Sequence, residues 1–305
     1  MRNSIFLQKL FSSLPKPILS SIVSSYIKIK SPYNKHKEHK RFIFDENGIP
    51  SIEYGKINDI KIGIQRNPVT ISQQTMTYYK QLQKKSTNQI KEKLLNCANW
   101  LVTNSVPVKN YSLLYYNFPW PAYNLEKPWV SAMAQGQAIQ ALINAHKILE
   151  DEKYLETAKL LLNSFHVETT DGGITYKDNS DRWWYEEYAS KKGKKSRVLN
   201  GMIFALFGIY DYYCYQKDPD AEFLFQQGIR ALKNDLPRYD YGKGYSYYDL
   251  LQNPARKYHK IHVEQLSQLY EITAEEIFKT YFERWKNFDY NKNMSNLIIE
   301  DILKQ

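Results

Sequence analysis

Apolar residues recur at helical spacing in paired segments along most of the chain, and this pattern limits the possible folds more than any other feature. The pairs are residues 130–149 with 151–166, 197–216 with 219–235, and 258–270 with 273–288. Turn-rich segments such as TTDGGITYKD and LPRYDYGKGYSYYDL separate them. Successive helix pairs close into an (α/α) barrel, also called a toroid, or stack as a solenoid. The sequence therefore predicts a mostly α fold built from paired helices.

A small β element is predicted ahead of the helices. The stretch RFIFDENGIPSIEYG joins β-rich residues to an Asn-Gly turn and a proline, which is typical of a hairpin. Pro68 and Thr70 then mark the start of a helix. We therefore divide the chain into residues 1–66, an N-terminal tail with a short β-hairpin region, and residues 67–305, an (α/α)-barrel domain.

Residues 5–29 are fairly apolar, but they are interrupted by Gln8, Lys9, Lys16 and several serines. A membrane span needs about 20 nearly continuous apolar residues, so this segment is too broken to be one. It also lacks a compact signal-peptide core. An interfacial helix and a tail packed on the domain are both open alternatives. We predict a cytoplasmic protein, with peripheral membrane association through this segment as the alternative.

The composition points to an anionic or flat ligand. The net charge of +10 favours nucleic acid, anionic membrane or an acidic glycan, and the 26 Tyr, 13 Phe and 6 Trp suit sugars, bases and proteins alike. No P-loop, GxGxxG, GxSxG or HExxH pattern occurs. The two cysteines, Cys97 and Cys214, are too few for a disulfide framework, and we predict that both are buried free thiols.

The stretch WWYEEYASKKGKKSRVLNG, residues 183–201, is the strongest local candidate for a site. A carboxylate such as Glu186 or Glu187 held near aromatic rings loses solvation, so its pKa rises and suits proton transfer. The alternative is a helix or strand end with its aromatic rings in the core. The lysines that follow, Lys191, Lys192, Lys194 and Lys195, form either a solvated loop or a basic segment that attracts a polyanion.

Two further clusters lie near residue 250. YDYGKGYSYYDL, residues 239–250, contains five tyrosines, and a nearby cation such as Lys243, Arg256 or Lys257 would lower a phenol pKa from about 10. An aromatic hairpin packed on the helices is the alternative. His259 and His262 share one helix face, but no third metal ligand is evident. We therefore predict histidines that orient a substrate or satisfy core hydrogen bonds, with no metal and no cofactor.

In this order and spacing, the motifs of the chain resemble those of the D-glucuronyl C5-epimerase family, whose members convert D-glucuronate to L-iduronate in heparosan-type chains. The motifs are NPVTISQ at 67–73, PWVSAMAQGQAI at 128–139, DGGITY at 171–176, WYEEY at 184–188, VLNG at 198–201 followed by IFALFGIYD, LPRYD at 236–240, YYDL at 247–250, YHKIHVEQL at 258–266 and RW at 284–285. The resemblance covers roughly residues 60–288. It implies an (α/α) barrel for residues 67–305 and no cofactor.

The resemblance implies four catalytic residues: Glu187, Tyr188, Tyr248 and Tyr258. It further leads us to expect substrate contacts from Trp120, Gln135, Trp184, Tyr185, Glu186, Lys194, Arg197, Asn200, Tyr239, Arg256, His259 and His262. The family has a basic residue just after YDL where this chain has Leu251 and Gln252, and the lysine-rich loop looks slightly longer here. An acidic, glucuronate-containing polysaccharide is the expected partner, and relatives suggest a homodimer.

The reaction that the resemblance implies fits these residue types. Removing the C5 proton of a uronate requires stabilisation of enolate-like charge, and inversion requires a base on one ring face and an acid on the other. We expect Glu187 on one face and Tyr258 or Tyr248 on the other, with Tyr188 orienting the sugar. The alternatives are a polysaccharide lyase, which would yield an unsaturated uronate, and a polyanion-binding module without catalysis. A nucleic-acid binder has no recognised module behind it.

Overall fold

The computed structural model describes residues 41–192 and 195–288. Within these ranges the chain is mostly helical, as the paired pattern predicts. The helices are α3 (Pro68–Lys84), α4 (Asn88–Asn104), α5 (Ala132–Leu149), α6 (Lys153–Asn163), α7 (Leu199–Gln216), α8 (Pro219–Asp235), α9 (Tyr258–Thr273) and α10 (Glu276–Trp285).

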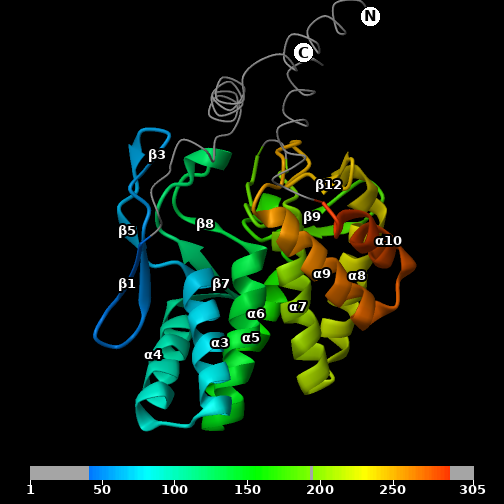
Figure 1. Cartoon of the computed structure of the whole chain (residues 1–305). Helices are drawn as coiled ribbons and strands as arrows, with labels where there is room; N and C mark the ends of the chain where they lie inside the picture. The colour runs from blue at the N-terminus through cyan, green and yellow to red at the C-terminus, as the bar shows by residue number, and fades with distance from the viewer. Residues whose placement is uncertain (1–40, 193–194, 289–305) are drawn as a thin grey trace, which may run out of the picture.

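The helices pack as four consecutive pairs in the described part of the chain. α3 packs on α4, α5 on α6, α7 on α8 and α9 on α10, while α3, α5, α7 and α9 contact one another in that order. Figure 1 shows this row running from α3 and α4 on one side to α9 and α10 on the other. The arrangement confirms the predicted α/α barrel class, in which the first helix of each pair forms an inner layer.

The helix starts follow from local capping chemistry. Asn67 accepts a hydrogen bond from the Thr70 N–H, and Pro68 occupies the first helical position of α3. The Ser131 hydroxyl caps α5 in the same way, by accepting from the Ala134 N–H. The capped first turns of both helices lie at the same end of the bundle, where a cavity opens.

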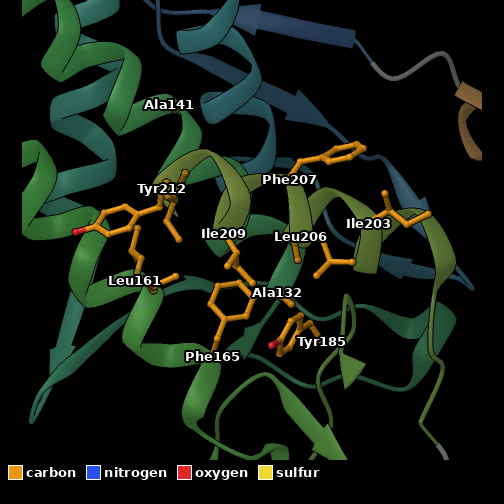
Figure 2. Close-up of a cluster of buried hydrophobic side chains, with 14 of the residues drawn as sticks. Ala132, Ala141, Leu161, Phe165, Tyr185, Ile203, Leu206, Phe207, Ile209 and Tyr212 are labelled. Atoms are coloured by element: carbon orange, nitrogen blue, oxygen red, sulfur yellow. The ribbon is translucent and has the colours of Figure 1, made fainter. Parts of the chain in front are cut away.

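A close contact between α5 and α7 forms the centre of the core. A Cβ added to Gly136 would lie 2.6 Å from the Ala205 Cα, and one added to Gly208 would lie 2.1 Å from the Gly136 carbonyl oxygen. Glycine at both positions therefore lets the two backbones approach. Figure 2 shows Leu206 and Ile209 of α7 beside the buried rings of this core.

Short strands cover the end of the bundle at which the inner helices begin. They are β1 (Arg41–Phe44), β2 (Pro50–Glu53), β3 (Lys56–Ile57), β4 (Ile60–Lys61), β5 (Ile64–Gln65), β6 (Ser105–Val108), β7 (Tyr111–Tyr116), β8 (Trp129–Val130), β9 (Thr175–Lys177), β10 (Trp183–Tyr185), β11 (Asp240–Gly242) and β12 (Tyr245–Ser246). In Figure 1, β8, β9 and β12 gather at this end.

The N-terminal hairpin forms as predicted. β1 pairs antiparallel with β2, and β5 pairs with the other edge of β2. Buried Ile52 and Tyr54 from this element pack on Tyr116, Phe118 and Trp120, in the segment between α4 and α5. The β element therefore packs on this segment between α4 and α5, which we call the aromatic segment. The division of the chain at residue 66 stays a prediction.

Two other expectations concern the cysteines and the membrane. Cys97 is a buried free thiol, as predicted, but Cys214 is exposed, so that prediction is wrong. Cys214 lies in the last turn of α7. No helix among the described residues is long and apolar enough to cross a membrane. The predicted interfacial segment, residues 5–29, lies outside the described residues.

Candidate active site

A cavity of about 380 Å³ opens where the inner helices begin. Each of α3, α5, α7 and α9 contributes residues from its first turns to the lining, including Thr70, Met133, Asn200 and Tyr258. The β element and the aromatic segment before α5 supply the rest of the wall. Four helix N-termini thus lie around one space, and the positive ends of their helix dipoles favour a negatively charged ligand there.

Glu187 reaches this cavity from the strip that follows β10. Its side chain is 8% exposed and lines the cavity. It packs against Gly201 in the first turn of α7, because a Cβ on that glycine would lie only 2.2 Å from the Glu187 Oε2. The glycine of VLNG therefore makes room for the carboxylate beside a helix N-terminus, where negative charge is stabilised.

Two predicted catalytic tyrosines lie next to Glu187. The Tyr248 hydroxyl is 3.5 Å from the Glu187 Oε1, at the long limit of a hydrogen bond, and the Tyr248 ring centroid is 4.7 Å from that of Tyr258. Tyr258, the first residue of α9, lines the cavity, whereas buried Tyr248 does not. Burial, followed by the negative charge of Glu187, raises the pKa of Tyr258 well above its ordinary value. Its phenol therefore keeps its proton near neutral pH.

The fourth predicted catalytic residue, Tyr188, belongs to an aromatic wall. Its ring stacks on Tyr123 at a centroid distance of 4.3 Å and is nearly parallel to Trp120, 6.3 Å away. Trp120 and Tyr188 both line the cavity. The Tyr123 hydroxyl donates to Asp249 in the YYDL segment at 2.6 Å, which ties this wall to the loop that carries Tyr248. Flat apolar faces with polar rims suit a sugar ring.

Polar groups for recognition also line the cavity. Asn200, predicted as a substrate contact, is 2% exposed, and its Oδ1 has no hydrogen-bond partner among the described residues. Lys257 is the only cationic side chain among the described residues of the lining. We did not predict Lys257 as a substrate contact, although it directly precedes Tyr258, a predicted catalytic residue and the first residue of α9. Asn67 and Tyr54 were also missed: Asn67 opens the NPVTISQ motif, whereas nothing in the sequence pointed to Tyr54.

Glu186 does not line the cavity, so its prediction as a substrate contact is not supported. It is fully buried, and its Oε2 accepts hydrogen bonds from the Ser196 hydroxyl and the Arg197 N–H, both at 3.1 Å. Burial raises its pKa to about 7, although both hydrogen bonds act in the opposite direction. Glu186 thus anchors the end of the basic loop while Glu187 faces the cavity.

The aromatic residues predicted beside these glutamates pack in the core instead. Trp184 stacks on Tyr239 at 5.8 Å, and the Tyr239 hydroxyl donates to the Arg197 carbonyl at 2.6 Å. The Tyr185 hydroxyl donates to the Leu224 carbonyl at 2.6 Å, and Figure 2 shows this ring in the core cluster. All three rings are almost fully buried and lie away from the cavity.

The remaining predicted contacts also have other partners. Gln135 bonds both backbone groups of Leu114 and so joins α5 to β7. Arg197 pairs with Asp235, and the backbone N–H of Arg256 donates to the Tyr245 hydroxyl. None of the three predicted residues lines the cavity, and Lys194 lies outside the described residues.

The two predicted histidines are buried as well. His259 and His262 both bond the Ser246 hydroxyl, so they satisfy polar groups in the interior, and they do not line the cavity. Within the described ranges, no three His, Cys, Asp or Glu side chains gather as they would to hold a metal ion.

Solved structures share this fold at low sequence identity. A D-mannose isomerase aligns with a TM-score of 0.52 over 90% of this chain and 74% of its own, at 13% identity. Unsaturated glucuronyl hydrolase from Streptococcus agalactiae aligns with a TM-score of 0.50 over 97% and 83%, at 14% identity. At such identities the comparison establishes the architecture alone.

Sequence relatives are more informative. An uncharacterized protein of Methanocaldococcus jannaschii is 32% identical over 269 residues, which is 82% of this chain and 86% of that protein. The D-glucuronyl C5-epimerase of Caenorhabditis elegans is 35% identical over 222 residues, which is 64% of this chain but 34% of the worm enzyme. The chain therefore spans about one third of that enzyme's length.

The family described as "D-glucuronyl C5-epimerase C-terminus" matches residues 109–287, more than half of the chain. The matched residues contain the WYEEY, VLNG, YYDL and YHKIH motifs that place Glu187, Tyr248 and Tyr258 together. The chain therefore belongs to the D-glucuronyl C5-epimerase family, through the C-terminal domain of that family.

Proposed function

We propose that the protein inverts C5 of D-glucuronate to L-iduronate within an acidic polysaccharide. The observation that carries the proposal is the convergence of Glu187, Tyr258 and Lys257 on one cavity, in a chain of this family. A base, a proton donor and a cation are the groups that this reaction needs.

The surroundings of Glu187 and Tyr258 favour a division of roles. Glu187 lies beside the N-terminus of α7, whose positive end attracts negative charge, and a carboxylate in this position suits a base. Tyr258 keeps its proton, because burial and the adjacent carboxylate raise its pKa, so it suits the acid. In the proposed reaction, Glu187 removes the C5 proton and Tyr258 returns a proton to the opposite ring face. For the reverse direction these roles exchange.

Tyr248 has a supporting role in this proposal. Its hydroxyl faces Glu187 at 3.5 Å, and its side chain does not line the cavity. A group that does not line the cavity cannot reach a sugar ring held there. Of the two tyrosines that the sequence offered as the acid, the geometry therefore favours Tyr258, while Tyr248 orients the Glu187 carboxylate.

The uronate carboxylate would meet positive potential in the cavity. The N-termini of α3, α5, α7 and α9 and the ammonium of Lys257 all favour an anion. Abstraction of the C5 proton moves charge onto this carboxylate, so the same groups stabilise the enolate-like transition state. Lys257 thereby takes the place of the basic residue that relatives have after YDL.

The test is incubation of the purified protein with heparosan and other glucuronate polymers in D2O. We expect NMR to show deuterium at C5 and signals of iduronate. Glu187→Gln should reduce the exchange roughly 100-fold or more, because it removes the base. Glu264→Gln, which changes an exposed carboxylate on α9 with 64% side-chain exposure, is the matched control and should exchange normally.

The same incubation separates epimerisation from elimination. A lyase would produce an unsaturated uronate, which absorbs in the ultraviolet, and would shorten the polymer. Chain cleavage without iduronate would replace the proposal by the lyase alternative. Absence of both deuterium at C5 and an unsaturated uronate in every glucuronate polymer tested would refute both.

A further inference from the structure

Ser246, His259 and His262 form a buried cluster next to the segments that carry Tyr248 and Tyr258. The hydroxyl oxygen of Ser246, in β12, is 2.9 Å from the Nδ1 of His259 and 2.9 Å from the Nδ1 of His262. The His259 Nε2 is 3.1 Å from the carbonyl oxygen of Trp285, the last residue of α10. Ser246 and His262 are fully buried, and His259 is 6% exposed.

The donor and acceptor roles in this cluster follow from one group that can only accept. Because the Trp285 carbonyl has no proton, the His259 Nε2–H must donate to it. In neutral His259 the Nδ1 is then an acceptor, so the Ser246 hydroxyl donates to it. Ser246 has no second proton, so the His262 Nδ1–H must donate to the Ser246 oxygen.

His259 must be neutral for this chain of hydrogen bonds to hold, and His262 must carry a proton on Nδ1. Burial lowers the pKa of His259, and burial together with His259 lowers the pKa of His262 to about 3. The Nε2 of His262 is then an unprotonated acceptor, and it has no hydrogen-bond partner among the described residues. The cluster thus runs in one direction, from His262 through Ser246 and His259 to Trp285.

The cluster connects the segments that carry the two tyrosines. Ser246 lies two residues before Tyr248, and His259 directly follows Tyr258. The Ala255 N–H donates to the Ser246 carbonyl at 3.0 Å, which closes the loop between the two segments. The relative position of Tyr248 and Tyr258 therefore depends on Ser246 holding β12 against the first turn of α9.

We propose that Ser246, His259 and His262 form a positioning relay with a single proton arrangement, which keeps Tyr248 and Tyr258 aligned on Glu187. The relay extends the proposed epimerase function and rests on it. Its members do not touch the substrate, so they act through the tyrosines. The fixed arrangement also explains why two histidines are buried next to a serine instead of apolar residues.

The first test does not depend on activity. Long-range 15N NMR of the full chain labelled at histidine reports which ring nitrogen carries the proton. We expect a neutral His259 with its proton on Nε2 and a neutral His262 with its proton on Nδ1, assigned through single-histidine variants. An Nε2–H tautomer at His262, or an imidazolium at His259, near neutral pH would overturn the relay.

The second test separates positioning from simple packing. Ser246→Ala should lower kcat for C5 exchange roughly 10- to 100-fold with little change in KM, because misplaced tyrosines affect the reacting geometry more than binding. It should also remove the preference of His262 for the Nδ1–H tautomer. Ser164→Ala, which removes another fully buried hydroxyl that does not line the cavity, should change neither kcat nor the tautomers.

A pair of variants at His262 tests the direction of the hydrogen bond. The Asn side-chain amide can occupy the place of Nδ1–H and donate to Ser246, whereas that of Gln extends to the place of Nε2. We therefore expect His262→Asn to retain more kcat than His262→Gln. Equal losses, or an unchanged kcat in Ser246→Ala, would refute the relay while leaving the proposed epimerase function standing. Absence of exchange in the unaltered protein would refute the function without affecting the tautomer result.

Discussion

At the scale of single residues, Glu186 and Glu187 show how neighbouring side chains acquire different chemistry. Glu187 lies against Gly201 at the start of α7 and faces the cavity. Glu186 turns into the interior, where Ser196 and Arg197 bond one carboxylate oxygen and burial raises its pKa to about 7. The two carboxylates diverge where the chain leaves β10 and bends at Glu187 and Tyr188.

Glu186 makes the stability of the protein depend on pH. Its pKa in the folded state, about 7, lies above the ordinary 4.5. Between these values the folded protein keeps a proton that the unfolded chain releases, so the free energy of unfolding falls as pH rises. Glu186→Gln removes this term. We expect the variant to gain stability relative to wild type, by roughly 3 kcal/mol in all, between about pH 5 and about pH 8.

Urea unfolding of both proteins across this range measures that difference, and other titrating groups largely cancel between them. A stability difference that does not change with pH would show that Glu186 is ionised throughout. The activity of the variant should persist, because Glu186 does not line the cavity.

Lys257 should decide the preference for a charged sugar. Lys257→Met removes the cation that lines the cavity, and we expect kcat/KM for a glucuronate polymer to fall roughly 10- to 100-fold. Lys260→Met, which changes a side chain that is 86% exposed on the same helix, is the control and should behave as wild type. Equal effects of the two substitutions would indicate only a loss of overall charge.

At the scale of elements, the first turn of α7 determines where the WYEEY strip can lie. The strip crosses α7 at Gly201, and farther along the same helix Gly208 permits the close approach to α5. At both positions a Cβ would clash with a neighbouring group, but the neighbour differs. One neighbour is the candidate base, and the other is the core of the bundle.

This difference predicts opposite signatures for two alanine substitutions in one helix. Gly201→Ala should lower kcat, since its Cβ would lie 2.2 Å from the Glu187 Oε2 and would displace the carboxylate. Gly208→Ala should instead lower stability by about 1–3 kcal/mol through overpacking against Gly136, with kcat unchanged below the unfolding temperature. Exchange assays and thermal unfolding of both variants provide the comparison. The element-scale account fails if Gly201→Ala exchanges as fast as wild type.

At the scale of the whole molecule, the inner helices and the net charge act in the same sense. The four inner helices begin at the cavity, and the chain carries a net charge of +10. An anionic polymer would therefore be attracted at long range and bound by helix N-termini at short range. The strands and the aromatic segment cover this end of the bundle and shape the cavity between them.

Salt should accordingly weaken binding more than catalysis. The Debye length falls from about 10 Å at 0.1 M salt to about 3 Å at 1 M, so long-range attraction is lost while the enclosed cavity is screened less. We expect KM for a long glucuronate polymer to rise steeply with salt and kcat to change little. A short oligosaccharide should show a smaller rise in KM, because fewer charges take part. A KM that is independent of salt would contradict this account.

The site was predictable from the sequence where a motif residue is also a cavity residue. Glu187, Tyr188, Tyr258 and Asn200 belong to the motifs and line the cavity, and Trp120, which lies outside the motifs, lines it as well. The neighbours of these residues were predicted less well, because adjacency along the chain does not reveal which side chain faces inward. Trp184, Tyr185 and Glu186 come from the same strip as Glu187 but are buried away from the cavity.

The sequence by itself determined the paired helices, their starts at Pro68 and other caps, the N-terminal hairpin and the family, because periodicity, capping and motif order are local properties of the chain. Three features depend on the tertiary structure: Lys257 lines the cavity, His259 and His262 both bond Ser246, and the Tyr248 hydroxyl lies next to the Glu187 carboxylate. These outcomes depend on which faces of separate helices and loops meet. Such contacts between distant segments form through packing and burial in three dimensions, which no local pattern records.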